Sequence, residues 1–290
     1  MSEKTLRARH RRLLERGGVR LDVIVEGHGP AILLLPSLGR DSEDYDDVAA
    51  FLASHGFTVL RPQPRGLGAS IGPMAGLTLA DYADDIDLVI AALGGGRAVI
   101  VGHAFGNWVA RMTAARHPTR VAGVVIAAAA AKQYPPHLTQ AIRRIADPAV
   151  DDTTRLQDLR DTFFAPGNDA RVWLHGWHRD VRDSQFAAHL ATPQHLWWSA
   201  GDAPLLDLQA AADPFLPADR RHELRDELGP RVSTALVENA SHALLPEQPA
   251  RVVEEIVRWV RTLGPLPCAS EPSLTEATAP SVPPTRNPSP

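Results

Sequence analysis

The segment Val99-Ile100-Val101-Gly102-His103-Ala104-Phe105-Gly106-Asn107 runs from an apolar, β-branched strand into a helix through two glycines. A turn this tight leaves room only for glycine two residues before and two residues after its apex. The apex residue itself is held in a strained backbone conformation. The sequence therefore predicts a sharp strand-to-helix turn with Ala104 at its apex, at a positive φ.

Strand-like and helix-like patterns alternate on both sides of this turn. Short apolar runs predict strands at residues 19–25, 31–35, 58–60, 98–101, 121–129, 205–209 and 232–237. Apolar residues at helical spacing predict helices at residues 44–54, 79–93, 107–116 and 250–263. We therefore expect an α/β fold, with a mostly parallel sheet and helices on both faces.

Residues 132–204 interrupt this alternation and predict a separate helical cap. The two parts of the core would then be residues 18–131 and 205–263. The cap holds four of the six tryptophans, which are Trp173, Trp177, Trp197 and Trp198. An insertion after a strand of such a sheet lies over the edge where ligands bind. We therefore expect these tryptophans to wall a pocket for a largely apolar or aromatic small molecule.

The two ends of the chain differ in composition from the rest. Residues 1–17 form a basic leader, read as frayed chain or a solvated helix, with a phosphate-binding arm as the lesser alternative. Residues 264–290 hold eight prolines and predict a disordered tail. The single cysteine, Cys268, lies in this tail as an exposed thiol. One cysteine allows no intrachain disulfide, which fits a reducing cytoplasm.

The bulk composition limits the kinds of partner that we expect for this chain. The chain has 290 residues, 44% of them hydrophobic and 22% charged, with a formal net charge of −4. Such a charge gives no reason to expect nucleic acid as a partner. The longest apolar runs, such as residues 121–131, are too short to span a bilayer, and no apolar segment follows the Arg-rich start. We expect a cytoplasmic protein without membrane contact; its oligomeric state stays open.

Residues 19–263 resemble the α/β-hydrolase family, whose nucleophile elbow has the pattern Gly-x-Ser-x-Gly. Three further segments resemble motifs of that family. Residues 33–40 match the oxyanion turn, with Pro36-Ser37 where family members often have His-Gly. Residues 63–70 match Asp-x-Arg-Gly-x-Gly-x-Ser, with Gln63 replacing the aspartate. Residues 209–217 resemble the loop of the catalytic acid, and residues 239–242 resemble Gly-Ala-Gly-His.

The resemblance implies site residues, and it exposes one departure. Ala104 stands where the family has its serine, and a methyl group can neither attack a carbonyl nor release a proton. His242 matches the general base. Its acid partner could be Asp202, Asp207 or Asp213; only Asp213 follows the strand and matches the acid loop, so we favour it.

The remaining functional groups follow from position. The backbone N–H groups of Leu38 and Phe105 would form the oxyanion hole. A serine elsewhere, Ser37 or Ser241, is a lesser alternative for the nucleophile. The cap histidines raise the question of a metal; they are His175, His178, His189 and His195. No cysteine or carboxylate pattern completes such a site, so we predict neither a metal nor a cofactor.

Three functions remain open. The first is hydrolysis of apolar or aromatic esters or lactones, with the serine lost naturally or by deliberate substitution. A weak further resemblance to bacterial lactone hydrolases of the zearalenone lactonase kind points the same way. The second is a lyase or cofactor-free oxygenase that uses His242 and Asp213 as a base without a covalent intermediate. The third is a binding protein without catalysis.

Overall fold

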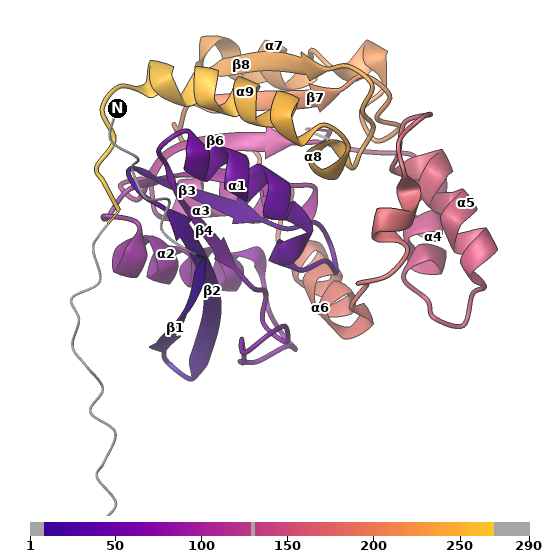
Figure 1. The fold of residues 1–290 in the computed structure, drawn as a ribbon, viewed down its shortest axis with the longest axis horizontal. Helices are drawn as coiled ribbons and strands as arrows, with labels where there is room; N and C mark the ends of the chain where they lie inside the picture. The colour runs from indigo at the N-terminus through magenta and orange to yellow at the C-terminus, as the bar shows by residue number, and fades with distance from the viewer. Residues whose placement is uncertain (1–8, 129–130, 270–290) are drawn as a thin grey trace, which may run out of the picture.

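The computed structural model describes residues 9–128 and 131–269, and in them an eight-stranded sheet (Figure 1). The strand order is β1-β2-β4-β3-β5-β6-β7-β8, and all neighbours are parallel except β1–β2 and β2–β4. The strands are β1 (His10–Arg16), β2 (Val19–Gly27), β3 (Ala31–Leu35), β4 (Thr58–Pro62), β5 (Ala98–His103), β6 (Val121–Ala127), β7 (Leu205–Ala210) and β8 (Val232–Val237). The predicted α/β architecture is confirmed.

Helices cover both faces of the sheet. On one face, α1 (Asp46–Ser54) lies beside α9 (Pro249–Val260); on the other, α2 (Leu79–Leu93) lies beside α3 (Phe105–Arg116) (Figure 1). Each pair packs its apolar side on the sheet and gives a separate buried cluster. The central strand β3 has no exposed residue, as a strand buried on both faces requires.

The chain reverses direction across the sheet at β3, and this creates the site. From β3 the chain passes to β4 on one side and then to β5 on the other. The loops that follow β3 and β5 therefore diverge and leave a crevice at the carboxyl ends of these strands. The predicted oxyanion turn follows β3, and the turn at Ala104 follows β5.

The insertion lies beyond the ends toward which β6 and β7 point, as Figure 1 shows. Its helices are α4 (Pro136–Ile145), α5 (Asp152–Thr162) and α6 (Arg179–Leu190), with short 3-10 turns at Ala170–Trp173 and Gln194–Leu196. Two short helices, α7 (Glu223–Leu228) and α8 (Leu244–Glu247), belong to the second part of the core and were not predicted.

The ends of the described chain correct two predictions. Residues 10–16 of the expected leader are neither frayed nor helical but form β1, paired with β2 along its whole length. The alternation of half-buried and exposed side chains in β1 is the strand period that the run of arginines obscured. Residues 264–269 are also placed. The backbone of Cys268 forms an isolated antiparallel β-bridge with Pro30, and the Ala269 N–H donates to the Gly29 carbonyl at 2.9 Å. Cys268 is exposed; residues 1–8 and 270–290 lie outside the described residues.

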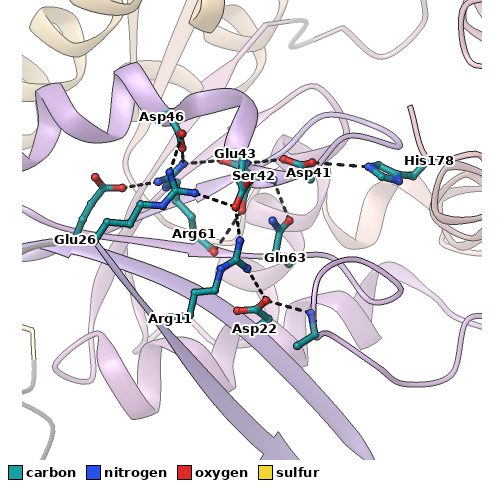
Figure 2. A network of polar contacts seen from close by, with 12 residues as sticks. Arg11, Asp22, Glu26, Asp41, Ser42, Glu43, Asp46, Arg61, Gln63 and His178 are labelled. Atoms are coloured by element: carbon teal, nitrogen blue, oxygen red, sulfur yellow. Dashed lines mark hydrogen bonds and ion pairs between the residues drawn. The ribbon is translucent and has the colours of Figure 1, made fainter. Parts of the chain in front are cut away.

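A network of charged side chains ties β1, β2 and β4 to the start of α1 (Figure 2). Arg61 of β4 is fully buried and contacts both Glu26 and Asp46. Arg11 of β1 reaches Asp22 of β2. A buried arginine that lost these carboxylates would leave an uncompensated charge, so the network fixes how the first hairpin sits on the core.

Gln63, the residue that departs from the family motif, has a backbone partner in this region. Its side-chain oxygen accepts the Ser42 N–H at 3.1 Å.

No helix within the described residues is long and apolar enough to cross a bilayer.

Candidate active site

The turn at Ala104 has the strained geometry that its glycines predict. Ala104 has φ 48° and ψ −109°, between the end of β5 and the start of α3. A Cβ atom on Gly102 would lie 2.3 Å from the Gly106 carbonyl oxygen, and one on Gly106 would lie 2.4 Å from the Leu35 carbonyl oxygen. Any side chain at either position would displace backbone. The predicted positive φ is confirmed, and the turn presents the Ala104 methyl group to the crevice.

His242 and Asp213 form the predicted pair. The Nδ1 atom of His242 lies 3.1 Å from both carboxylate oxygens of Asp213. The Phe215 N–H also donates to Asp213 Oδ1, at 2.9 Å, and the centroid of the Phe215 ring lies 4.0 Å from that of His242, with the two rings tilted by 31°. Because the carboxylate accepts the Nδ1 proton, the Nε2 atom keeps its lone pair. His242 lines the same cavity as Ala104, so this nitrogen is available as a base there.

The other two candidate acids lie elsewhere. Asp207 is buried within β7, where the Gln209 side-chain amide donates to it at 2.6 Å. Burial raises the pKa of the Asp207 carboxyl to about 7. Asp202 is exposed on the loop before β7. A residue inside a strand cannot reach the loop edge, and this is why the position just past the strand provides the partner of His242.

The two residues predicted to supply an oxyanion hole lie in the wall of the same cavity. Leu38 and Phe105 both line it, and Phe105 is the first residue of α3. Within residues 9–128 and 131–269 neither of these two N–H groups has an acceptor. A helix start that presents free N–H groups favours a negatively charged oxygen.

The cap holds the oxyanion turn in place. The N–H of Gly39 donates to the Gln185 side-chain oxygen of α6 at 2.8 Å, and the Gly39 carbonyl accepts the His178 N–H at 2.9 Å. Gln185 is buried. These two hydrogen bonds tie the residue after Leu38 to the cap, and Leu38 itself lines the cavity. Gln185 could not be predicted from the sequence, because the contact joins residues far apart in the chain.

A buried hydrogen-bond chain joins three loops of the site. The Ser37 N–H donates to the Tyr45 hydroxyl at 3.1 Å, and that hydroxyl lies 2.8 Å from His103 Nδ1. His103 Nε2 lies 2.7 Å from the His242 carbonyl oxygen, which can only accept, so Nε2 carries the proton. Burial lowers the pKa of His103 to about 3, with the nearby His242 adding to the effect. Neutral His103 thus connects the oxyanion turn, the elbow and the loop of the base.

The cavity above Ala104 is mostly apolar and has a volume of about 320 Å³. Core and cap both contribute to its wall, which consists of Ser37, Leu38, Ala104, Phe105, Asn107, Trp108, Ala131, Tyr134, Thr139, Ile142, Arg143, Phe163, Trp177, Arg182, Asp183, Phe186, Phe215 and His242. The volume lies at the lower end of the range for small-molecule sites.

Only one of the four predicted tryptophans lines this cavity, namely Trp177. Trp173 is buried behind it, beneath the Arg40 guanidinium at 4.9 Å. Trp197 and Trp198 are buried around the guanidinium of Arg111, at 4.9 and 4.5 Å. The expectation that at least one of the four lines a cavity with Ala104 is confirmed by Trp177, while the other three lie outside the wall, because composition does not tell which rings reach a cavity.

Arg111 explains why two of these rings are internal. Its guanidinium is fully buried and donates to the Asn107 side-chain oxygen and to the Trp198 carbonyl. Burial lowers its pKa to about 9. The indole faces replace water around the charge. Trp108 of α3 lines the cavity instead. It was not predicted, because only the tryptophans of the cap were considered.

The structure places the alternative serine nucleophiles and the cap histidines in different surroundings. Ser37 lines the cavity, whereas the Ser241 hydroxyl donates to the Ala212 carbonyl at 3.0 Å. His189 stacks on Trp108 at 3.9 Å, and His178 lies 3.8 Å from Asp41. No three His, Cys, Asp or Glu side chains of the described residues are grouped to hold a metal ion.

Comparison with known proteins agrees with this geometry. The model of the alpha/beta hydrolase family matches residues 32–255. The 2-(acetamidomethylene)succinate hydrolase of Mesorhizobium japonicum is 33% identical over 39% of this chain and 41% of its own length. A putative non-heme haloperoxidase of Mycobacterium phage D29 is 27% identical over 80% of this chain and 86% of its own.

A solved esterase of Exiguobacterium antarcticum has the same fold, with a TM-score of 0.71 at 17% identity, over 86% of this chain and 98% of that one. The chain spans 33% to 41% of the length of the first curated relatives that it matches.

Proposed function

The chain belongs to the alpha/beta hydrolase family, and on this premise we propose that its cavity is the active site of a hydrolase of apolar or aromatic esters or lactones, with alanine in the place of the nucleophile. One observation carries the proposal. Ala104 occupies a strained apex at φ 48°, in the wall of a cavity that His242 also lines, and His242 is paired with Asp213. Strain of this kind persists only where the surrounding structure holds it.

Each remaining group has a role in the form that carries serine. The hydroxyl would attack the ester carbonyl while His242 Nε2 takes its proton. The N–H groups of Leu38 and Phe105 would hold the negative oxygen of the tetrahedral intermediate. Protonated His242 would then give its proton to the leaving alcohol, and water would release the acyl group by the same route. Asp213 orients His242 and balances its charge.

The wall of the cavity supports the substrate class. Aromatic rings from both layers face it, including Trp108 of α3, Trp177 of the cap and Phe215 beside His242. Such surfaces favour flat apolar groups. With alanine at position 104 this chain would bind such a substrate without forming an acyl-enzyme.

A second candidate function rests on the intact pair beside the methyl group. His242 and Asp213 keep their geometry, so His242 could remove a proton from a bound substrate or from water. Binding without any turnover is the third possibility. Turnover by the chain as it stands, abolished by His242→Gln, would favour the second candidate, and tight binding without turnover in every variant would favour the third.

The test of the proposal is Ala104→Ser assayed with 4-nitrophenyl esters of aryl and alkyl acids and with aryl lactones. We expect a burst of nitrophenol equal to the enzyme present, followed by turnover. In serine hydrolase triads, loss of the serine costs on the order of 10⁶ in turnover, so the gain should be large. A fluorophosphonate probe should add once to this variant, with mass spectrometry placing the adduct at position 104.

Two matched variants make the result specific. Ala104→Ser with His242→Gln should lose the burst, and Ala104→Ser with Ser37→Ala should keep it. If Ala104→Ser folds, binds the esters and gives neither burst nor adduct, the hydrolase proposal fails.

A further inference from the structure

The charged side chains in the cavity wall are unevenly compensated. Apart from His242, the charged residues of the wall are Arg143, Arg182 and Asp183. Arg182 donates to Asp183 from two nitrogen atoms, at 2.9 and 2.6 Å. The positive charge of Arg182 and the negative charge of Asp183, both in α6, therefore compensate each other. The positive charge of Arg143 is left without such compensation.

Arg143 has no partner of its own in the described residues. No hydrogen bond or ion pair within residues 9–128 and 131–269 involves its guanidinium, and its side chain is exposed. The next residue gives a comparison within the same helix. Arg144 binds both oxygens of Asp158 in α5, at 2.7 and 2.6 Å. Helix α4 thus uses one arginine to hold α5 and leaves the other over the cavity.

The spacing along α4 explains this division. Thr139, Ile142 and Arg143 are separated by three and four positions, so they share one face of the helix, and all three line the cavity. Leu138, Ala141 and Ile145 are the buried residues of the helix, which packs on α5. The placement of Arg143 therefore follows from the orientation of α4, and Arg143 joins a wall that is mostly apolar.

We propose, on the basis of the function proposed above, that the substrate carries a carboxylate at the end remote from the scissile carbonyl, and that Arg143 binds it. The substrate class is then a half-ester of a dicarboxylic acid, or a similar anionic ester, with an apolar or aromatic body. A guanidinium presents two parallel N–H groups that match a carboxylate. Arg143 acts as a specificity residue, because it stands apart from Ala104 and His242 in the cap.

The present chain permits a binding test without turnover. The ligands are benzyl hydrogen glutarate and its neutral analogue benzyl methyl glutarate, which share the benzyl ester and differ in the charge at the far end. Calorimetry, or the fluorescence of Trp108 and Trp177 in the wall, reports the dissociation constants. We expect the half-ester to bind at least about tenfold more tightly than the diester, with the preference falling as salt is added.

Variants on the two faces of α4 locate the effect. Arg143→Gln should bring the two ligands to within about twofold of each other, and Arg143→Lys should keep part of the preference. Arg144→Gln, the control at the neighbouring arginine that binds Asp158, should leave the preference intact. Equal binding of both ligands to the unmodified chain, or a preference that survives Arg143→Gln, would overturn the inference.

The failure of this inference and that of the hydrolase proposal give different results. A burst from Ala104→Ser on neutral esters, without any preference for the half-ester, would overturn the role of Arg143 alone. A preference that depends on Arg143, without a burst from Ala104→Ser on any ester, would support the anion site and overturn the hydrolysis.

Discussion

Replacing Tyr45 by phenylalanine tests the buried chain that joins the loops of the site. The hydroxyl accepts the Ser37 N–H and lies within hydrogen-bond distance of His103 Nδ1, and all three residues are at most 2% exposed. Phenylalanine fills the same space but satisfies neither group. The change therefore leaves one buried donor and one buried acceptor without partners.

The size of the effect follows from those two groups. A buried polar group that loses its partner costs about 1–3 kcal/mol. Two such groups predict a loss of roughly 2–6 kcal/mol in the free energy of unfolding. At roughly 2–4 °C per kcal/mol for a large domain, that corresponds to a fall in Tm of roughly 4–24 °C. Urea unfolding followed by tryptophan fluorescence, together with calorimetry, would measure both quantities.

Tyr82→Phe is the matched control. Tyr82 is also buried, and its hydroxyl lies 3.2 Å from Ser184 Oγ. Ser184 keeps a second partner, because its hydroxyl donates to the Met74 carbonyl at 2.6 Å. We expect this variant to lose less than about 1 kcal/mol. If Tyr45→Phe loses no more stability than Tyr82→Phe, the hydrogen-bond chain does not hold the loops together.

Two further predictions concern a buried carboxyl and the cap. Burial raises the pKa of Asp207 to about 7, so the folded protein keeps a proton that the unfolded chain releases, and this group lowers stability as pH rises from about 4 to about 7. Asp207→Asn should therefore raise the free energy of unfolding at pH 8 by on the order of 4 kcal/mol, with the gain vanishing near pH 4; parallel stability curves would contradict this. In the Ala104→Ser background, Gln185→Ala should lower kcat for ester hydrolysis by roughly tenfold with a smaller change in KM, because a displaced oxyanion donor weakens binding of the transition state. Gln185→Glu, which keeps an acceptor for the turn, should recover most of the loss, and an unchanged kcat in Gln185→Ala would contradict the role of the cap.

The helices and central strands could be predicted from the sequence, because their signals are local. The helix at 79–93 and the strand at 31–35 have the predicted bounds. Their periodicity reflects burial on one or both faces of a single element. The first hairpin strand could not be predicted in this way, since the side chains that hold Arg11 come from other parts of the chain.

The candidate site residues could also be predicted from the sequence, because they lie in loops with fixed backbone requirements. Glycine at 102 and 106 forces the apex, and the loops after β7 and β8 place Asp213 and His242. Each of these residues is identified by its position after a strand, and parallel strands bring such positions to one edge.

Only the tertiary structure decided what surrounds the apex. It placed Trp108 and Trp177 in the wall and turned Trp197 and Trp198 toward Arg111. It likewise left Arg143 over the cavity. Whether a given side chain lines the cavity depends on how the cap packs on the core. Contacts between distant segments leave no periodic pattern in the sequence. The sequence by itself determined the fold and the positions of the candidate site residues, whereas packing between the two layers determined the shape and charge of the space above them.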